Sequence, residues 1–385
     1  MSSCSNQAQK DKMAIDKLDT MFQELYPENE PGAAVLILKG DKILYDKGFG
    51  LADLETGAKI DGNTFFNIAS VSKQFTATAM LKLAQEGKIS LDDNVKKFFP
   101  EFKGDFFEQV TIRHLLSHTS GIGDYRPRED RDFVLYATDE QCYKYMENLK
   151  SLHFAPGTEY QYMNPTFQLC FIIIQKVTGM GFEQYMKENI FTPAGMDQTV
   201  YFSPDKQIPN MSHGYIPIEE SESSNTDSDR TPEAQAAAKK QQESAPVIGN
   251  WREYDYGEET FFATKADGGI YTSTHQFVQW EKALRNATVL SAEAIKEAHT
   301  PKIQVSGSKF SSYQNRPHTH YGYGWFIEND PEFTERIYHT GDNGGYQIYA
   351  GRYPASDLLI LIFANRSDYD RWTNVKKVDA IAKEA

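Results

Sequence analysis

The feature that most constrains the fold is the placement of strand-forming segments at the two ends of the chain. Near the start, residues 33–39 and 42–48 read as strands joined by a Gly40-Asp41 turn. Four more strand patterns lie near the end of the chain, at residues 324–328, 336–340, 346–353 and 358–364. Helical and polar segments fill the middle. This distribution predicts an α+β fold, in which an antiparallel sheet built from both ends and flanked by helices lies beside a mostly helical lobe.

The predicted helices lie both beside the strands and between them. Apolar periodicity indicates helices at residues 11–26, 75–84, 167–178, 273–284 and 369–383. We interpret residues 11–385 as a single catalytic domain. Its sheet lobe would comprise about residues 11–66 and 260–385, and its helical lobe about residues 67–259.

Two segments differ in composition from the rest of the chain. Residues 1–10 are predicted to be disordered. Residues 219–245 form a polar, low-complexity insertion, first rich in acidic residues and serine, then in Ala, Lys, Gln and Glu. The insertion has two interpretations: a solvated, disordered segment, or a helical flap beside a cleft that limits substrate size.

Ser70 opens the segment that most clearly indicates chemistry. An apolar helical pattern follows it and ends at Gly87, which places Lys73 one turn further on and facing the same way. A serine hydroxyl is a poor nucleophile unless a neighbour accepts its proton. A lysine can do so only when it is neutral, and burial lowers its pKa in that direction, as does the positive end of a helix dipole.

Single motifs of this kind are weak evidence, so their order matters. The Ser-x-x-Lys spacing recurs at Ser203/Lys206 and Ser306/Lys309, but neither of those serines opens an apolar helix. The ordered combination is more specific. It consists of Ser70, Lys73, Tyr162, Asn164 and the run His339-Thr340-Gly341.

This ordered set resembles the serine β-lactamase and penicillin-binding-protein superfamily. The most similar branch holds class C β-lactamases, D-alanyl-D-alanine carboxypeptidases and related esterases. The resemblance runs from about Pro31 to about Asp368, and four further phrases carry it, at residues 111–122, 156–158, 268–273 and 321–325. It implies a β-lactamase/transpeptidase-like fold with the active site between the two lobes.

The resemblance also implies roles for individual residues. Ser70 matches the serine that is acylated, Lys73 its partner base, and Tyr162 a second proton carrier. Asn164 matches the amide that holds the acyl-side carbonyl of the substrate. The substrate-binding strand would carry His339, Thr340 and Gly341, and the main-chain N–H of Asp342 would complete an oxyanion hole with that of Ser70.

His339 departs from the Lys-Thr-Gly sequence of many relatives. An imidazole titrates near neutral pH, so we expect its charge, and with it the binding of a substrate carboxylate, to vary with pH. This substitution weakens the case for a dedicated β-lactamase. It leaves the machinery for acyl transfer intact.

The expected function is a serine hydrolase that acts through an acyl-enzyme on D-residue-terminated peptides or related amides, including ones derived from peptidoglycan. Two alternatives stay open. One is an esterase or acyltransferase that uses an alcohol. The other is a penicillin-binding or sensor domain that is acylated without turnover.

Charge and composition exclude several other classes. The net charge of −14 argues against nucleic acid and anionic membranes as partners. No apolar run reaches transmembrane length. His318 and His320 lack companion ligands, so we expect no metal, and the sequence indicates no cofactor.

The three cysteines have no metal-binding spacing. Cys142 and Cys170 are predicted to be core residues, although a disulfide between them stays open. Cys4 lies in a segment that resembles the remnant of a bacterial lipoprotein signal, which would make it a lipid anchor; the alternative is a stray cysteine in a frayed terminus. Together with the family resemblance, this predicts a location in the bacterial periplasm or cell envelope.

Overall fold

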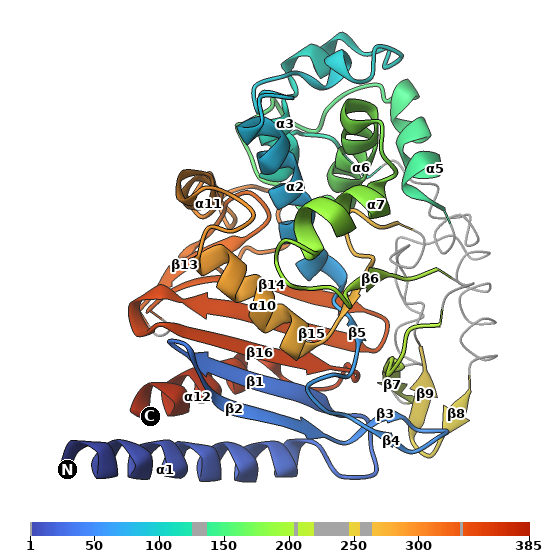
Figure 1. Cartoon of the computed structure of the whole chain (residues 1–385). Helices are drawn as coiled ribbons and strands as arrows, with labels where there is room; N and C mark the ends of the chain where they lie inside the picture. The colour runs from blue at the N-terminus through green and yellow to red at the C-terminus, as the bar shows by residue number, and fades with distance from the viewer. Residues whose placement is uncertain (1, 125–136, 204–206, 219–245, 255–263, 332–333) are drawn as a thin grey trace.

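The computed structural model describes residues 2–124, 137–203, 207–218, 246–254, 264–331 and 334–385. The predicted insertion at residues 219–245 lies outside these ranges. Figure 1 shows a strand-rich part that carries both termini and a helical part stacked on it. This arrangement confirms the predicted α+β class with a β-lactamase/transpeptidase-like architecture.

The central sheet has eight strands, and all neighbouring strands are antiparallel. In spatial order they are β11 (Ile303–Gln304), β12 (Thr319–Tyr321), β13 (Phe326–Asp330), β14 (Thr334–Asn343), β15 (Tyr346–Tyr353), β16 (Leu358–Ala364), β1 (Ala33–Lys39) and β2 (Lys42–Phe49). Strand β1 pairs with β16, from Ala33 opposite Ala364 to Lys39 opposite Leu358. The sheet therefore joins the two ends of the chain, as the strand distribution predicts.

The apolar runs in β1 and β16 arise because both faces of the sheet are covered. Alternate side chains along a strand point to opposite faces. Accordingly Leu36 and Leu361 belong to one buried cluster, while Ile37 and Ile360 belong to another. The first cluster includes side chains of α2 (Lys73–Gln85) and α10 (Thr274–Arg285), and the second includes those of α1 (Ser2–Leu25) and α12 (Arg371–Glu384). The helices α1 and α12 thus lie on the face opposite α10 (Figure 1).

The remaining helices form the second part of the molecule or connect it to the sheet. They are α3 (Ile112–Leu116), α5 (Asp139–Lys144), α6 (Asn164–Thr178), α7 (Phe182–Met186) and α11 (Ala292–Ala298). In Figure 1, α3, α5, α6 and α7 gather at the end of the molecule away from the termini, and α2 runs from the sheet into them. The cluster that contains α2 continues into α6 without a break, so the two parts share one core.

Three small sheets complete the described strands. They are β5 (Phe66–Asn67), β10 (Ile270–Thr272) and β6 (Val200–Tyr201); β3 (Leu51–Asp53) and β4 (Ala58–Lys59); and β7 (Tyr215–Pro217), β9 (Trp251–Glu253) and β8 (Val247–Ile248). The first of these sheets is the most relevant to function, because β5 leads directly into the Ser70 turn.

Helix α1 is longer than predicted. It begins at Ser2 and continues through residues that the sequence predicts to be disordered. The division of the chain into a sheet lobe and a helical lobe at the stated boundaries stays a prediction. Cys142 and Cys170 are both buried and form no disulfide with each other, which confirms their interpretation as core residues. None of the helices in the described ranges combines the length and apolar character needed to cross a bilayer.

Candidate active site

A tight turn places Ser70 between β5 and α2. Ala69 has a φ of 44°, in the left-handed region, which costs a residue with a Cβ on the order of 1 kcal/mol. The Ala69 N–H donates a hydrogen bond of 2.7 Å to Asn67 Oδ1, and this bond supports the strained conformation. Ser70 lies in the short 3-10 turn Ala69–Ser72 and is half-buried, so the residue keeps contact with solvent.

Lys73 is the first residue of α2, and its side chain is buried. Its Nζ donates hydrogen bonds to Ser70 Oγ (3.0 Å) and to the main-chain oxygen of Asp267 (2.8 Å). The same atom lies 4.9 Å from the centre of the Tyr162 ring, a cation–π distance. The predicted nucleophile and base are therefore in direct contact, and Tyr162 lies beside them.

The Tyr162 phenol is held in its neutral form. Burial raises the pKa of Tyr162 well above its ordinary value, and the neighbouring Tyr321 and Tyr313 act in the same direction. The Ser70 side chain acts in the opposite direction as a polar neighbour, although Tyr162 Oη forms no hydrogen bond of standard geometry with the described residues. The phenol can therefore donate a proton at any ordinary pH.

Asn164 lies next to this group at the start of α6. Pro165 follows it, a residue whose fixed φ suits the first turn of a helix. Asn164 is half-buried, and its Oδ1 is buried without a hydrogen bond to the described part of the chain. Unpaired buried polar atoms are rare and often mark a place where a ligand binds.

Strand β14 runs directly beside the Ser70 turn because it carries a glycine there. A Cβ on Gly341 would lie 2.2 Å from the Ile68 main-chain oxygen and 3.1 Å from the Ala69 Cβ. Since the nearest contact is with the Ile68 backbone, which cannot move aside like a flexible side chain, only glycine allows so close an approach. The half-buried Thr340 and the exposed Asp342 therefore flank the point where β14 meets the turn.

His339 is buried and hydrogen-bonded on both ring nitrogens. Its Nδ1 lies 2.7 Å from the Thr340 carbonyl oxygen, which can only accept, so Nδ1 carries the hydrogen. Its Nε2 lies 3.0 Å from Tyr321 Oη, which can donate to it. Burial, helped by the positive charge of Lys73, lowers the pKa of His339 to about 3.

The expectation that His339 changes charge near neutral pH is therefore wrong. The value for an unperturbed imidazole applies to a hydrated ring, whereas this ring is 1% exposed and faces a lysine. At neutral pH the third motif carries no charge on its histidine. Its assignment as a substrate-binding residue stays a prediction.

The Asp342 carboxylate is directed toward α12. The Arg371 guanidinium donates two hydrogen bonds to it, one of 3.0 Å to Oδ2 and a shorter one to Oδ1. The side chain of Asp342 is thus engaged away from the serine. Only its main-chain N–H is left for the predicted oxyanion hole, and that role stays a prediction.

His118 also belongs to this group of residues, although sequence reasoning does not assign it to the site. Its ring centre lies 4.2 Å from that of Tyr162, and its Nδ1 accepts a hydrogen bond of 3.2 Å from the Met163 N–H. Burial and the charge of Lys73 lower the pKa of His118 well below its usual value. No local pattern signals this role, because the contacts are made by residues distant in the sequence. Tyr321 joins the same group through the contact of its Oη with His339 Nε2.

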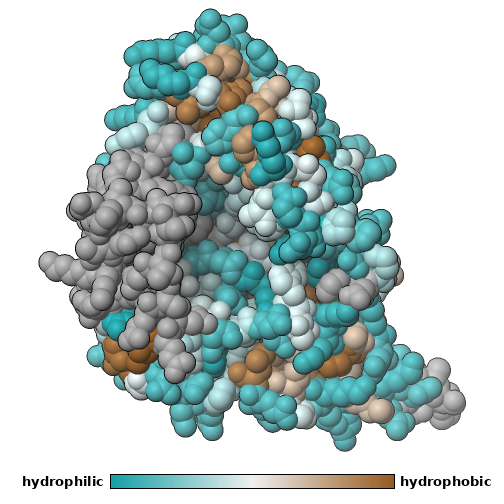
Figure 2. Space-filling model, turned by 180° about the vertical axis from the view of Figure 1, so that it is seen from behind, coloured by the Kyte–Doolittle hydropathy of each residue, from teal (hydrophilic) through white to brown (hydrophobic). Residues whose placement is uncertain are grey.

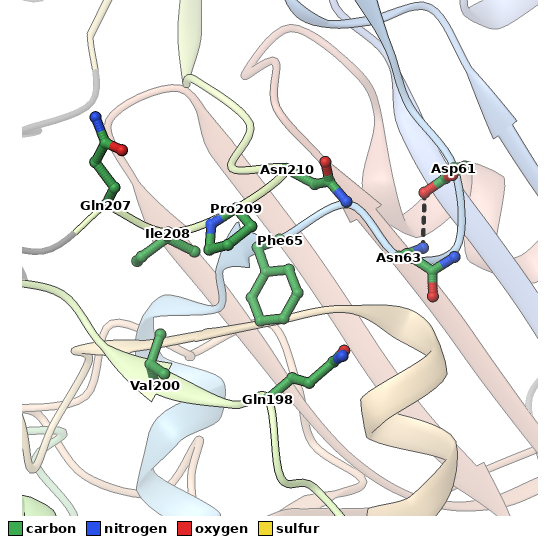
Figure 3. Close-up of a pocket in the computed structure, with 9 residues that line it drawn as sticks. All are labelled: Asp61, Asn63, Phe65, Gln198, Val200, Gln207, Ile208, Pro209 and Asn210. Atoms are coloured by element: carbon green, nitrogen blue, oxygen red, sulfur yellow. Dashed lines mark hydrogen bonds between the residues drawn. The ribbon is translucent and has the colours of Figure 1, made fainter.

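A separate pocket of about 650 Å³ lies away from these residues. Figure 3 shows the apolar and polar side chains that line it: Asp61, Asn63, Phe65, Gln198, Val200, Gln207, Ile208, Pro209 and Asn210. None of its lining residues belongs to the candidate catalytic set. The opposite view in Figure 2 shows a hollow between the helical and the strand-rich parts, with a mostly hydrophilic surface around it.

Comparisons with known proteins support the same family. The Beta-lactamase family model matches residues 18–382. Penicillin-binding protein 4* of Bacillus subtilis (strain 168) is 28% identical over 364 residues, which cover 91% of this chain and 72% of that protein. Protein flp of Staphylococcus aureus (strain MW2) is also 28% identical over 364 residues, covering 92% of this chain but only 64% of its own length.

A solved structure agrees with these sequence matches. The octameric penicillin-binding protein homologue from Pyrococcus abyssi has a TM-score of 0.74 and 27% identity, covering 95% of this chain and 76% of that one. The chain spans less than two thirds of the length of protein flp. Because the family model covers nearly the entire sequence, this chain belongs to the Beta-lactamase family, within the serine β-lactamase and penicillin-binding-protein superfamily.

Proposed function

We propose that this chain is a serine hydrolase that forms an acyl-enzyme on Ser70, with D-residue-terminated peptides or related amides as substrates. The observation that carries the proposal is the 3.0 Å hydrogen bond between Lys73 Nζ and Ser70 Oγ. A general base must lie within hydrogen-bond reach of the proton that it removes, and Lys73 meets this requirement. Membership of a superfamily of serine hydrolases supports the same reaction class.

The acylation step follows from this geometry. Neutral Lys73 accepts the Ser70 proton as Oγ attacks the substrate carbonyl carbon. The negative charge that develops on the carbonyl oxygen is stabilised by the main-chain N–H groups of Ser70 and Asp342. Tyr162, which is neutral, donates its proton to the leaving nitrogen and recovers one from Lys73. The C–N bond breaks, and the acyl group stays on Ser70.

Deacylation uses the same groups in the opposite sense. A water molecule attacks the acyl carbon and loses one proton, which Tyr162 relays to neutral Lys73; Lys73 holds this proton for the serine oxygen. The C–O bond to Ser70 breaks, and the serine oxygen takes the proton back. The side-chain N–H of Asn164 donates to the acyl-side carbonyl of the substrate during both steps, while its Oδ1, unpaired within the described residues, can accept from a substrate N–H.

The neutral state of His339 favours a second candidate activity, in which the substrate carries no terminal carboxylate. A buried, uncharged imidazole cannot attract a terminal carboxylate by charge. Substrates whose leaving group is uncharged, such as amides and esters, do not need that attraction. The alternative activity is therefore that of an esterase or acyltransferase, in which an alcohol replaces water or the leaving amine.

The first test is intact-mass spectrometry after mixing the protein with a penicillin or a fluorophosphonate. We expect a single covalent adduct on the wild type and none on Ser70→Ala. Ser306→Ala is the matched control, since Ser306 also precedes a lysine by three residues but lies in a loop. An adduct that persists in Ser70→Ala would refute the assignment of the nucleophile.

The second test separates the candidate activities. Turnover is measured on D-alanyl-D-alanine peptides, D-amino acid amides and short p-nitrophenyl esters, with and without an alcohol as acceptor. Release of amine or alcohol with regeneration of the free enzyme supports a hydrolase. A stable adduct without product on every substrate would instead favour the non-turnover binding domain.

A further inference from the structure

The second hydrogen-bond partner of Lys73 Nζ lies in a short loop that is held by hydrogen bonds from α2 on one side and from Asp139 on the other. The loop precedes β10, and the main-chain oxygen of Asp267 accepts the 2.8 Å hydrogen bond from Lys73 Nζ. One residue earlier, the Ala266 main-chain oxygen accepts a hydrogen bond of 2.7 Å from Thr76 Oγ1 on α2. Lys73 and Thr76 lie one turn apart, so α2 contacts this loop at two consecutive carbonyl groups.

A carboxyl group from the helical part holds the other side of the loop. Asp139, the first residue of α5, is 1% exposed. Its Oδ2 accepts a hydrogen bond of 2.7 Å from the Lys265 N–H, and its Oδ1 accepts one of 3.3 Å from the Ala266 N–H. One side chain thus fixes the two peptide groups that precede the carbonyl contacting Lys73.

Burial of this carboxyl group is costly, which indicates that it does more than fill space. Asp267 is also 1% exposed, and its Oδ2 accepts a 3.4 Å hydrogen bond from Gln168. Burial and the nearby charge of Asp267 raise the pKa of Asp139 well above its usual value. Two buried carboxyl groups that interact in this way titrate as a pair. Perturbed carboxyl groups of this kind cluster at functional sites.

We propose that Asp139 is a positioning residue for the catalytic lysine, because its carboxyl group holds the Lys265–Asp267 backbone so that the Asp267 carbonyl accepts a hydrogen bond from Lys73. The proposal rests on Lys73 acting as the base of the proposed function. Asp139 acts through the loop, not on the substrate.

The proposal predicts the direction in which the pKa of Lys73 changes when Asp139 is replaced. Groups that face its ammonium include the Asp267 carbonyl, the neutral Tyr162 ring, and the imidazoles of His118 and His339. In Asp139→Asn, the amide group presents an N–H where a carboxyl oxygen accepted one, so one hydrogen bond to the loop is lost. A less firmly held Asp267 carbonyl makes a weaker hydrogen bond to Lys73 Nζ, which disfavours the ammonium form and lowers the pKa of Lys73.

The experiment compares wild type, Asp139→Asn, Thr76→Val and the control Glu183→Gln. Glu183 forms an ion pair with the Lys265 side chain, so its removal perturbs the same loop without touching the hydrogen bonds of its backbone. The rate constant for labelling by a fluorophosphonate is measured against pH. The pKa of Lys73 is measured independently by NMR on protein with labelled lysine side chains, assigned with Lys73→Arg.

We expect the plateau labelling rate of Asp139→Asn to fall roughly tenfold to a hundredfold, the usual effect of small misplacement of a catalytic group. The acid limb and the Lys73 pKa should both move to lower pH, by about one unit, as expected for loss of one such interaction. Thr76→Val should change in the same direction and provides the test if Asp139→Asn does not fold. Glu183→Gln should behave as wild type.

Unchanged labelling and an unchanged Lys73 pKa in folded Asp139→Asn would overturn the proposal. Equal effects in Glu183→Gln would do the same, because the effect would then come from general loosening of the loop. If the wild type does not label but its Lys73 pKa still shifts in Asp139→Asn, the proposed function fails while the positioning role stands. These outcomes keep the two proposals separate.

Discussion

The buried His339 predicts a specific acid sensitivity of the fold. In the folded chain its pKa is about 3, whereas in the unfolded chain the imidazole should titrate near the ordinary value of 6.5. Between these values the unfolded state binds a proton that the folded state excludes. The pKa is depressed on folding, so the stabilisation is complete above pH 6.5. It is lost progressively as the pH falls from 6.5 toward 3.

The size of the effect follows from this difference in proton binding. Each pH unit within the window changes the free energy of unfolding by about 1.4 kcal/mol per group. At pH 5 the contribution of His339 is therefore on the order of 2 kcal/mol. This is a large fraction of the roughly 5–15 kcal/mol by which a typical native protein is stable.

The assay is urea unfolding of wild type and His339→Gln at several values between pH 5 and pH 8. Glutamine does not titrate, so the difference in unfolding free energy between the two proteins isolates His339. His118 is buried and His299 partly buried, and the pKa of each is lowered; both are present in the two proteins, so the difference in unfolding free energy reports chiefly on His339. The wild type should lose its advantage by about 1.4 kcal/mol per unit below pH 6, and the difference should be flat above pH 7. Parallel curves over the whole range would refute a neutral, buried His339.

Three further predictions concern the site. KM of the wild type for a carboxylate-bearing substrate should show no step between pH 5.5 and 8. A step seen with that substrate but not with a neutral ester, and lost in His339→Gln, would contradict this prediction. Tyr162→Phe should lower turnover by about a hundredfold to ten-thousandfold, the range of proton-transfer catalysis, with little change in melting temperature; normal turnover would mean that Tyr162 only packs. Gly341→Ala should cost about 1–3 kcal/mol of stability and slow the labelling of Ser70, because its Cβ would meet the Ile68 backbone. Gly307→Ala, which meets nothing within 4 Å, is its control, and equal stability of the two variants would argue against the close approach.

The features predicted correctly from the sequence are those with local periodicity. The run Val35-Leu36-Ile37 reads as a strand because both faces of the sheet are buried there, and the similar run at residues 358–364 is correctly placed in the same sheet. The direct pairing of these two strands is not predicted. The contact between Ser70 and Lys73 follows from one helical turn. Such features depend on neighbours in the sequence, so the pattern contains the necessary information.

The features that could not be predicted depend on residues that only the fold brings together. The charge state of His339 is set by its burial and by the charge of Lys73, and its ring contacts Tyr321. Neither Lys73 nor Tyr321 is a close neighbour of His339 in the sequence. Asp139 looks like an ordinary acidic residue in the first turn of a helix, and its bonds to Lys265 and Ala266 are invisible in the sequence. Electrostatic properties of buried groups therefore require the tertiary structure.

The pairing of β1 with β16 also affects how the chain can be synthesised. Ala33 emerges from the ribosome early, but its partner Ala364 lies near the other end of the chain. Closing so long a loop costs on the order of 5 kcal/mol in chain entropy, and no part of this pairing can form until residue 358 has been synthesised. Strand β1 can pair early with β2, but its other edge must stay unpaired while the helical part is made. Slow, late folding with a need for chaperones is the expected consequence, and a circular permutant that joins the two ends directly should fold faster.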